Sequence, residues 1–298
     1  PENPHLLPDQ AMNIGKAIAA KDYYLIQGPP GTGKTSVVIM QILLYTVQTQ
    51  KKHCTVLAYT NRAVDEICNR LENNGIDYIL LSSSSQNKKS LKNIFREYTT
   101  LNTLHSRIKS VRVYVATVTS YFSHFEKIRR LSPELHTLIV DEASQLLEPH
   151  LIGILPAYRK FILVGDHYQL PAVSQLSDRK SLTIPEPLKE IGITDLRHSL
   201  FERLWHQAVR NKWDQAFGTL KNQFRMHLTI QELINKYYDQ QLQPGKPEQT
   251  ASAPHFPSAT SDRNLKILAS SRVIFINSSK GSSPSSRINR LEAEITVE

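Results

Sequence analysis

The sequence predicts a doubly wound, mainly parallel α/β sheet. Between residues 23 and 164, short runs rich in β-branched and aromatic residues alternate with helix-forming stretches. A glycine-rich loop follows the first of these runs, and two carboxylates, Asp141 and Glu142, end a later one. Sheets of this class bind ligands at the carboxyl ends of their strands. Both features are therefore expected at one edge of the sheet.

Each expected element has its own signal in the chain. Runs of apolar and β-branched residues predict strands at 23–26, 55–58, 79–81, 113–116, 137–140 and 161–164, with helices at 36–46 and 64–71. Proline and glycine among Ser, Thr and Ala predict a long surface loop at 241–262. A strand at 273–276 and the start of a helix at 288–295 are expected beyond it.

Composition narrows the class of protein. The 298 residues are 40% hydrophobic and 21% charged, enough for one large globular domain and part of another. No apolar run of about 18 residues and no signal-peptide pattern occur. An intracellular, cytoplasmic protein with no membrane contact is therefore expected. Cys54 and Cys68 lack the paired spacing of a metal site and predict buried thiols.

The formal net charge of +9 is concentrated in one stretch. Residues 86–130 contain ten basic and two acidic residues, and so contribute most of the excess. A concentrated basic surface favours a polyanionic partner, because neutralising phosphates releases counterions. A solvated helical face explains the same charges equally well.

The glycine-rich loop GPPGTGKT matches G-x-x-x-x-G-K-[ST] between a strand and a helix. Its glycines let backbone N–H groups point at phosphate oxygens, and the helix beginning near Lys34 adds its positive dipole end. Lys34 is expected to contact the β and γ phosphates, and the Thr35 hydroxyl to bind Mg²⁺. The predicted nucleotide-binding residues of this P-loop are Gly28, Pro29, Pro30, Gly31, Thr32, Gly33, Lys34 and Thr35.

The segment LIVDEASQ at 138–145 supplies the second half of such a site. Asp141 is expected to hold Mg²⁺ together with Thr35, directly or through water. Glu142 is expected to orient and deprotonate the attacking water. A strand-terminal Asp-Glu pair alone is weak evidence, and the P-loop makes it specific.

DEASQ is more specific still, and six other segments accompany it in a familiar order. Together they resemble the branch of superfamily 1 helicases that includes the nonsense-mediated-decay RNA helicase and the helicase half of the Okazaki-fragment nuclease-helicase. The segments are residues 7–10, GPPGTGKT, LAYTNRAVDEI, VYVATVTSYF, IVDEASQ, ILVGDHYQLPAV and LKNQFRMH. The position of DLRHSLFERL at 195–204 most resembles the nuclease-helicase and its bacterial relatives.

The resemblance implies two RecA-like P-loop NTPase domains that close over ATP. Residues 1–220 are expected to form the first, with a basic insertion near 71–112, and residues 221–298 the beginning of the second. Two later motifs of the second domain are missing from the sequence. We therefore expect a truncated second domain in a chain cut from a longer protein. Such a monomer would bind ATP weakly, hydrolyse it slowly and lack processive unwinding without the remainder of that domain.

The resemblance also assigns roles around the nucleotide. Gln10 would read the adenine edge, although a surface glutamine is an alternative. Gln169 would sense the γ-phosphate or its attacking water, while Asp166 holds the loop around it. Phe224 would lie against the base. Arg225 would act as an arginine finger that stabilises charge on the γ-phosphate.

Five further residues are expected to contact single-stranded nucleic acid, with DNA slightly favoured over RNA. They follow two strands and carry short hydroxyl, amide or guanidinium groups that bind backbone without reading sequence. They are Thr60, Asn61, Arg62, Thr117 and Thr119. Helix N-capping is an alternative for Thr60, Asn61 and Thr119.

These patterns favour an ATP hydrolase that drives a helicase or translocase, moving 5′ to 3′ by the resemblance. The catalytic residues would be Lys34, Asp141, Glu142, Gln169 and Arg225. The alternative is a nucleotide-dependent switch or scaffold with a helicase-like fold and no translocation. A P-loop kinase or GTPase does not fit DEASQ and GDHYQLP. Trp205 and Trp213, at helical spacing, predict core packing.

Overall fold

The computed structural model describes residues 6–81, 87–98, 100–131, 135–182, 184–251 and 273. The strand expected at 273–276, apart from Val273, and the helix expected at 288–295 lie outside these residues. So does the loop expected at 241–262 beyond residue 251.

A seven-stranded sheet with every pairing parallel forms the centre of the molecule, in the order β3-β4-β2-β5-β6-β1-β7. The strands are β1 (Tyr23–Gln27), β2 (Cys54–Ala58), β3 (Ile79–Leu80), β4 (Val113–Thr117), β5 (Thr137–Val140), β6 (Lys160–Gly165) and β7 (Phe217–Thr219). The predicted doubly wound sheet is therefore confirmed. Its inner strands are buried on both faces, which is why they read as continuous apolar runs.

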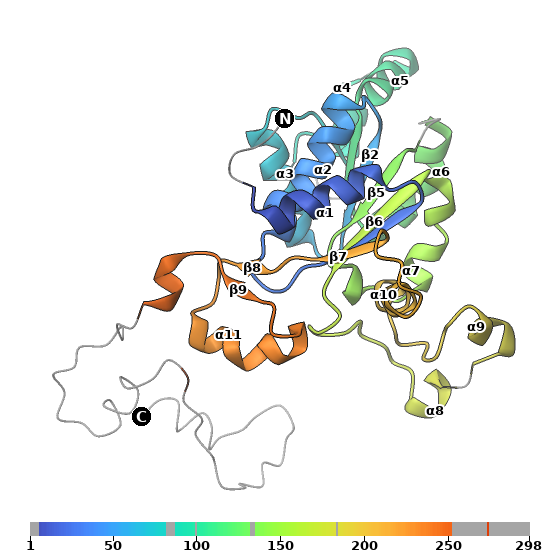
Figure 1. Ribbon diagram of the computed structural model, residues 1–298. Coiled ribbons are helices and arrows are strands. Elements are labelled where there is room, and N and C mark those ends of the chain that lie inside the picture. The colour runs from blue at the N-terminus through green and yellow to red at the C-terminus, as the bar shows by residue number, and fades with distance from the viewer. Residues whose placement is uncertain are drawn as a thin grey trace, which may run out of the picture.

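Helices cover both faces of this sheet (Figure 1). Side chains of successive strand residues enter opposite cores, so Tyr24 and Ile26 pack in one cluster and Leu25 in the other. The first cluster is covered by α1 (Pro8–Ala19), the continuous helical segment η1 (Lys34–Ile39), α2 (Met40–Leu44) and η2 (Tyr45–Thr49), and α3 (Asn61–Asn73). The second is covered by α4 (Leu91–Glu97), α5 (Leu101–Ser110), α6 (Val118–Leu131), α7 (Pro149–Ile152) and α10 (Leu200–Arg210).

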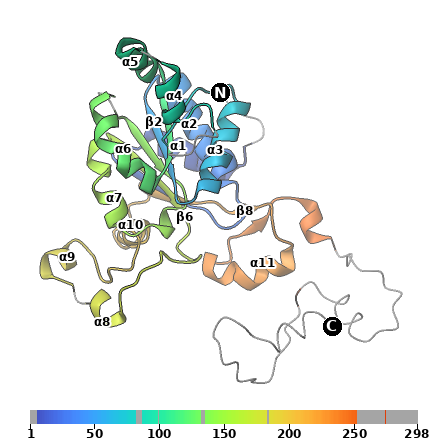
Figure 2. The ribbon, with the colours of Figure 1, turned by 180° about the vertical axis from the view of Figure 1, so that it is seen from behind.

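Two appendages leave the sheet (Figures 1 and 2). The arm, residues 178–195, contains α8 (Asp178–Ser181) and α9 (Glu186–Glu190). The second, which we call the β8–β9 unit, spans residues 222–250 and is built on a two-stranded parallel sheet. Its elements are β8 (Asn222–Gln223), α11 (Leu228–Asn235), η5 (Lys236–Tyr238), β9 (Gln243–Pro244) and η6 (Pro247–Thr250).

The β8–β9 unit corrects the expected loop at 241–262. Residues 241–250, the first ten of that expected loop, contain β9 and the 3₁₀ turn η6 instead. Gln231 and Asn235 of α11 donate their side-chain amides to the Leu242 carbonyl at 2.7 and 3.2 Å, both in buried positions. Asn235 also accepts from the Leu242 N–H at 2.9 Å. These contacts bind the segment after α11 back onto the helix.

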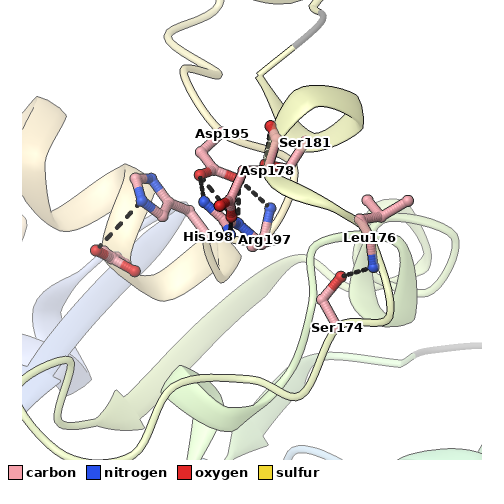
Figure 3. Close-up of polar contacts among 8 residues, drawn as sticks. Ser174, Leu176, Asp178, Ser181, Asp195, Arg197 and His198 are labelled. Carbon is pink, nitrogen blue, oxygen red and sulfur yellow. Dashed lines mark hydrogen bonds and ion pairs between the residues drawn. The ribbon is translucent and has the colours of Figure 1, made fainter.

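A guanidinium anchors the arm to the segment that precedes α10 (Figure 3). Arg197 forms ion pairs with Asp178 of α8 and with Asp195, the latter at 2.7 Å. The Arg197 hydrogen bonds lower the pKa of Asp195 to about 2. Farther along, Arg203 of α10 pairs with Glu148 at 2.6 Å, and both side chains are nearly buried. The block 195–204 thus links the arm to the segment before α10, and α10 to Glu148 at the start of α7.

The structure tests the predicted burial of the two cysteines and the two tryptophans. Cys54 and Cys68 are buried free thiols, as expected. Trp205 is buried on α10, but Trp213 is 47% exposed, so the packing prediction was wrong for the second tryptophan. α10 ends at Arg210, before Trp213, and the helical spacing does not continue to it.

Among the described residues, no helix is both long enough and apolar enough to span a bilayer.

The amino edge of the sheet contains a buried lysine. Lys160, the first residue of β6, is 4% exposed. Its Nζ donates to the carbonyls of Ala17, Ile18 and Ala20 at 3.1, 2.8 and 3.4 Å. Lys160 therefore satisfies carbonyls at the end of α1 that have no partner within the helix.

Lys160→Met should destabilise the protein, because methionine keeps the apolar stem but cannot donate to these carbonyls. We expect a loss of about 2 kcal/mol in the free energy of unfolding, measured by urea denaturation. Arg159→Met is the matched control, since the neighbouring Arg159 side chain is exposed. An equal loss in both variants would show that the carbonyl contacts contribute nothing specific.

Candidate active site

The P-loop lies between β1 and the helical segment that begins at Lys34. Gly31 and Gly33 both have φ of +79°, a conformation that favours glycine. A Cβ on Gly28 would lie 2.1 Å from Cγ of Lys34, so the lysine stem crosses this glycine. Gly33 is the N-cap of η1, and the helix start expected near Lys34 is confirmed. The loop therefore presents a helix N-terminus at the carboxyl edge of the sheet.

The P-loop and the Asp-Glu pair meet in space. The Thr35 hydroxyl donates to Oδ2 of Asp141 at 2.6 Å, and Lys34 Nζ lies 3.4 Å from Oε1 of Glu142. The Glu142 N–H donates to Oδ1 of Asp141 at 2.9 Å. Glu142 has a left-handed backbone with φ of 52°, which turns the chain sharply at the end of β5. Four of the predicted site residues are thus in direct contact.

Burial dominates the electrostatics of Asp141. The carboxylate is 1% exposed, and burial raises its pKa to about 6, with the Thr35 hydrogen bond opposing the rise. A buried carboxylate is stabilised by a nearby cation. The adjacent Thr35 hydroxyl adds a second hard oxygen, the ligand type that Mg²⁺ prefers. The predicted metal residues Thr35 and Asp141 therefore fit a magnesium ion chemically.

The loop after β6 packs against the DEASQ segment. The Asp166 N–H donates to Oγ of Ser144 at 3.1 Å. Asp166 in turn accepts from the Tyr168 N–H at 3.2 Å and from Nε2 of Gln169 at 2.7 Å. The expectation that Asp166 holds this loop is confirmed by these contacts. They hold the Gln169 amide at the Asp166 carboxylate, in the loop that contacts Ser144.

Gln10 and its neighbour lie on the first turn of α1. Gln10 is 3% exposed and donates to the Thr32 carbonyl at 3.2 Å, which excludes the surface alternative. Asp9 accepts from the N–H groups of Lys221 and Asn222 at 2.7 and 3.4 Å. One turn of helix therefore holds both the P-loop and the entrance to the β8–β9 unit.

Phe224 and Arg225 border the P-loop from the other side. The Phe224 N–H donates to the Gly31 carbonyl at 2.9 Å. A Cβ on Gly31 would lie 2.5 Å from Cβ of Arg225, so only glycine allows this approach. The side chains of Phe224 and Arg225 are both exposed. Gln223, fully buried, accepts from the Arg225 N–H at 2.9 Å and fixes the turn.

The expected nucleic-acid residues follow β2 and β4, on the same sheet edge. Thr60 accepts from the Ala63 N–H at 3.2 Å and caps α3, so the capping alternative holds there. Thr117 makes the same kind of contact with the Ser120 N–H at 3.2 Å. Asn61 and Thr119 lie inside the first turns of α3 and α6, and their side chains are exposed together with that of Arg62. Capping therefore does not explain Asn61 and Thr119.

Sequence comparison matches two regions of the chain. Residues 10–175 match the sequence profile of the AAA domain, and residues 196–298 match a second profile of that description. The chain belongs to the AAA domain family. The first matched region, residues 10–175, includes the P-loop, the Asp-Glu pair and Gln169.

Curated relatives confirm the resemblance to the nuclease-helicase branch of superfamily 1. The chain is 31% identical over 277 residues to the DNA replication ATP-dependent helicase/nuclease JHS1 of Arabidopsis thaliana, covering 90% of this chain and 19% of that protein. It is 32% identical over 248 residues to human DNA replication ATP-dependent helicase/nuclease DNA2, covering 79% of this chain and 21% of that protein. The chain thus spans about a fifth of the length of these curated relatives.

Two solved structures have a low structural similarity to this chain. Arterivirus nonstructural protein 10 (helicase) in complex with DNA has a TM-score of 0.45 and 19% identity, covering 83% of this chain and 47% of that chain. Pif1 helicase from Candida albicans has a TM-score of 0.41 and 16% identity, covering 82% and 46%. Neither likeness adds to the sheet order already described.

Sequence reasoning missed three residues that shape the site. Ser144 lies within DEASQ, and its place in that motif could have identified it. Asp9 directly precedes Gln10 in the family segment 7–10, which offered a weaker signal. Tyr238 donates to Oδ2 of Asp166 at 2.7 Å, and no motif at its position predicts this contact.

The pKa of Asp141 predicts that stability falls as pH rises. The folded protein keeps the Asp141 proton up to about pH 6, whereas an unfolded aspartate loses it near about pH 4. Between these values the folded state binds more protons, so the free energy of unfolding decreases. Asp141→Asn removes this titration and should stabilise the nucleotide-free protein by about 2 kcal/mol at pH 7.

Urea unfolding across that pH range tests this prediction in the absence of Mg²⁺. Asp214→Asn is the control, because the Asp214 side chain is exposed. A pH profile of Asp141→Asn that follows those of the wild type and the control would contradict it.

Proposed function

We propose that the chain is the ATP-hydrolysing core of a helicase that moves along single-stranded DNA. One observation carries the proposal: Thr35 contacts Asp141 and Lys34 contacts Glu142 at a single sheet edge. The relatives described as DNA replication helicase/nucleases support DNA as the substrate. In this proposal residues 1–220 form the first RecA-like domain, and residues 221–298 begin the second.

ATP would occupy the space around the P-loop. Its phosphates would lie at the N-terminus of η1, where Lys34 can exchange Glu142 for the β and γ phosphates. The Gln10 amide already holds the Thr32 carbonyl, and its remaining hydrogen-bonding capacity would read adenine. The Phe224 ring lies against Gly245 and is partly exposed, and from there it would meet the base.

Hydrolysis needs a base and a means of stabilising charge. Oε2 of Glu142 is buried and has no hydrogen-bond partner among the described residues, so it can accept a proton from water. Thr35 and Asp141 would hold Mg²⁺, which when bound neutralises charge on the phosphate oxygens. Arg225, beside Gly31, would supply positive charge to the γ-phosphate.

The nucleic-acid track would cross the ends of β2 and β4, and β2 adjoins β5 in the sheet. The exposed side chains of Asn61, Arg62 and Thr119 can contact phosphates there, and Thr60 and Thr117 fix the helix starts. The basic helices α4 and α5 lie away from the β8–β9 unit, at the other end of the molecule (Figures 1 and 2). Their charge therefore does not carry this proposal.

Substitution of the proposed base tests the chemistry. Glu142→Gln should lower the turnover of ATP at least about 100-fold while ATP binding persists, because the amide cannot take the proton. Lys34→Met should abolish both binding and turnover. The measurement is Mg²⁺-dependent phosphate release by the intact protein with single-stranded DNA, single-stranded RNA or neither. Lys180→Met, on the exposed arm, is the control.

Wild-type turnover by Glu142→Gln would refute the proposed base. ATP hydrolysis at the same rate with DNA, with RNA and without either would refute translocation.

Arg62 tests the track. Arg62→Ala should weaken binding of single-stranded DNA to a similar extent for different sequences, because phosphate contacts carry no sequence information. The slope of log affinity against log salt should fall by about one unit. Fluorescence anisotropy at several salt concentrations measures both. Arg210→Ala, at the exposed end of α10, should leave the slope unchanged, and an equal effect of the two substitutions would exclude this track.

A further inference from the structure

Tyr238 connects the β8–β9 unit to the loop that carries Gln169. Its hydroxyl donates to Oδ2 of Asp166 at 2.7 Å, and Nε2 of Gln169 donates to the same oxygen at 2.7 Å. Asp166 is fully buried and Tyr238 is 8% exposed. One side chain from the β8–β9 unit and one from the loop after β6 therefore share one buried carboxylate oxygen.

The backbone around Tyr238 fixes its position within the unit. Asp239 and Gln240, directly after it, have φ of 52° and 58°, a left-handed conformation that costs free energy for non-glycine residues. The Gln240 N–H donates to the Asn235 carbonyl at 3.0 Å, and the Gln241 N–H to the Tyr238 carbonyl at 2.9 Å. This strained turn closes back onto α11 and holds the tyrosine in place.

The same unit carries Arg225. The buried Gln223 accepts from the Arg225 N–H, and its Nε2 donates to Oε1 of Gln231 on α11 at 2.9 Å. Gln231 and Asn235 are bound in turn to the Leu242 carbonyl. Arg225 and Tyr238 are therefore parts of one hydrogen-bonded unit, and any displacement of that unit would move both.

We propose that Tyr238 is a positioning residue that orients Gln169 through the shared Asp166 oxygen. It aligns Gln169 only while the β8–β9 unit, which carries Arg225, remains in contact with the loop after β6. The proposal rests on the proposed ATPase function. A fully buried carboxylate oxygen that loses a donor must find another or shift. Because Gln169 is the other donor to that oxygen, it shifts with it.

Ring packing and hydrogen bonding can be separated at this position. Tyr168 lies edge-on to the Tyr238 ring at 5.5 Å, a contact that phenylalanine would keep. Tyr238→Phe therefore removes the hydroxyl alone. Tyr237→Phe is the matched control, because Tyr237 is 50% exposed on the same element and its ring also faces Tyr168, at 6.1 Å.

The first experiment observes Gln169 directly. The side-chain NH₂ signals of Gln169 are assigned in the intact, ligand-free protein by comparison with Gln169→Ala, and followed by NMR. We expect them to shift or broaden in Tyr238→Phe and to stay in place in Tyr237→Phe. Unchanged signals in Tyr238→Phe would overturn the proposal.

The second experiment measures coupling in ATP hydrolysis. Tyr238→Phe should lower kcat about fivefold and leave the KM for ATP unchanged, as expected for one lost hydrogen bond that acts on alignment. In a Gln169→Ala background, Tyr238→Phe should cause no further loss, because the residue it positions is gone. A fivefold loss in both backgrounds would indicate general destabilisation and overturn the proposal.

The two experiments keep this inference separate from the proposed function. A wild-type protein without Lys34-dependent ATP hydrolysis would refute the function. The NMR signals of Gln169 would then still decide whether Tyr238 positions it.

Discussion

The hydrogen bond between Thr35 and Asp141 is the contact on which the geometry of the site depends. It joins the helical segment after the P-loop to the end of β5, although β6 separates β5 from β1 in the sheet. Asp141 is buried, so its carboxylate needs a donor or a cation beside it. The sheet thus holds the Asp141 carboxylate in a buried position, where its negative charge is energetically unfavourable. The same position favours the binding of a divalent cation most strongly. Lys34 and Glu142 lie on the same two segments, the start of η1 and the chain after β5.

Much of the fold was predictable because its strands are buried on both faces. Such strands appear in the sequence as continuous apolar runs, and loop motifs at their ends show the direction of the chain. The short strands β7, β8 and β9 give no comparable signal. β9 contains Pro244 and pairs over two residues, so its existence depends on the contacts of α11 with Leu242 rather than on local preference. Propensity cannot report a contact of that kind.

The candidate site divides in the same way. The motif residues around the P-loop and DEASQ were predictable, because their spacing is fixed by local backbone geometry. Asp9 and Tyr238 were not, since their partners lie 212 and 72 residues away and neither belongs to a periodic pattern. The structure also changed the interpretation of Gln10, whose amide already holds Thr32. The contacts that position the reactive residues could not be predicted from the sequence.

The first turn of α1 has a consequence for how this chain can vary. Asp9 and Gln10 are consecutive, yet one holds the backbone at 221–222 and the other the carbonyl of Thr32. A helix rotates by about 100° per residue, so one inserted residue in this turn would swing both side chains away from their partners at once. The arm around α8 and α9 is held in part by the exposed ion pair of Arg197 with Asp178, and it tolerates changes of length far better. Length variation among homologous chains is therefore expected in the arm and excluded from this single turn.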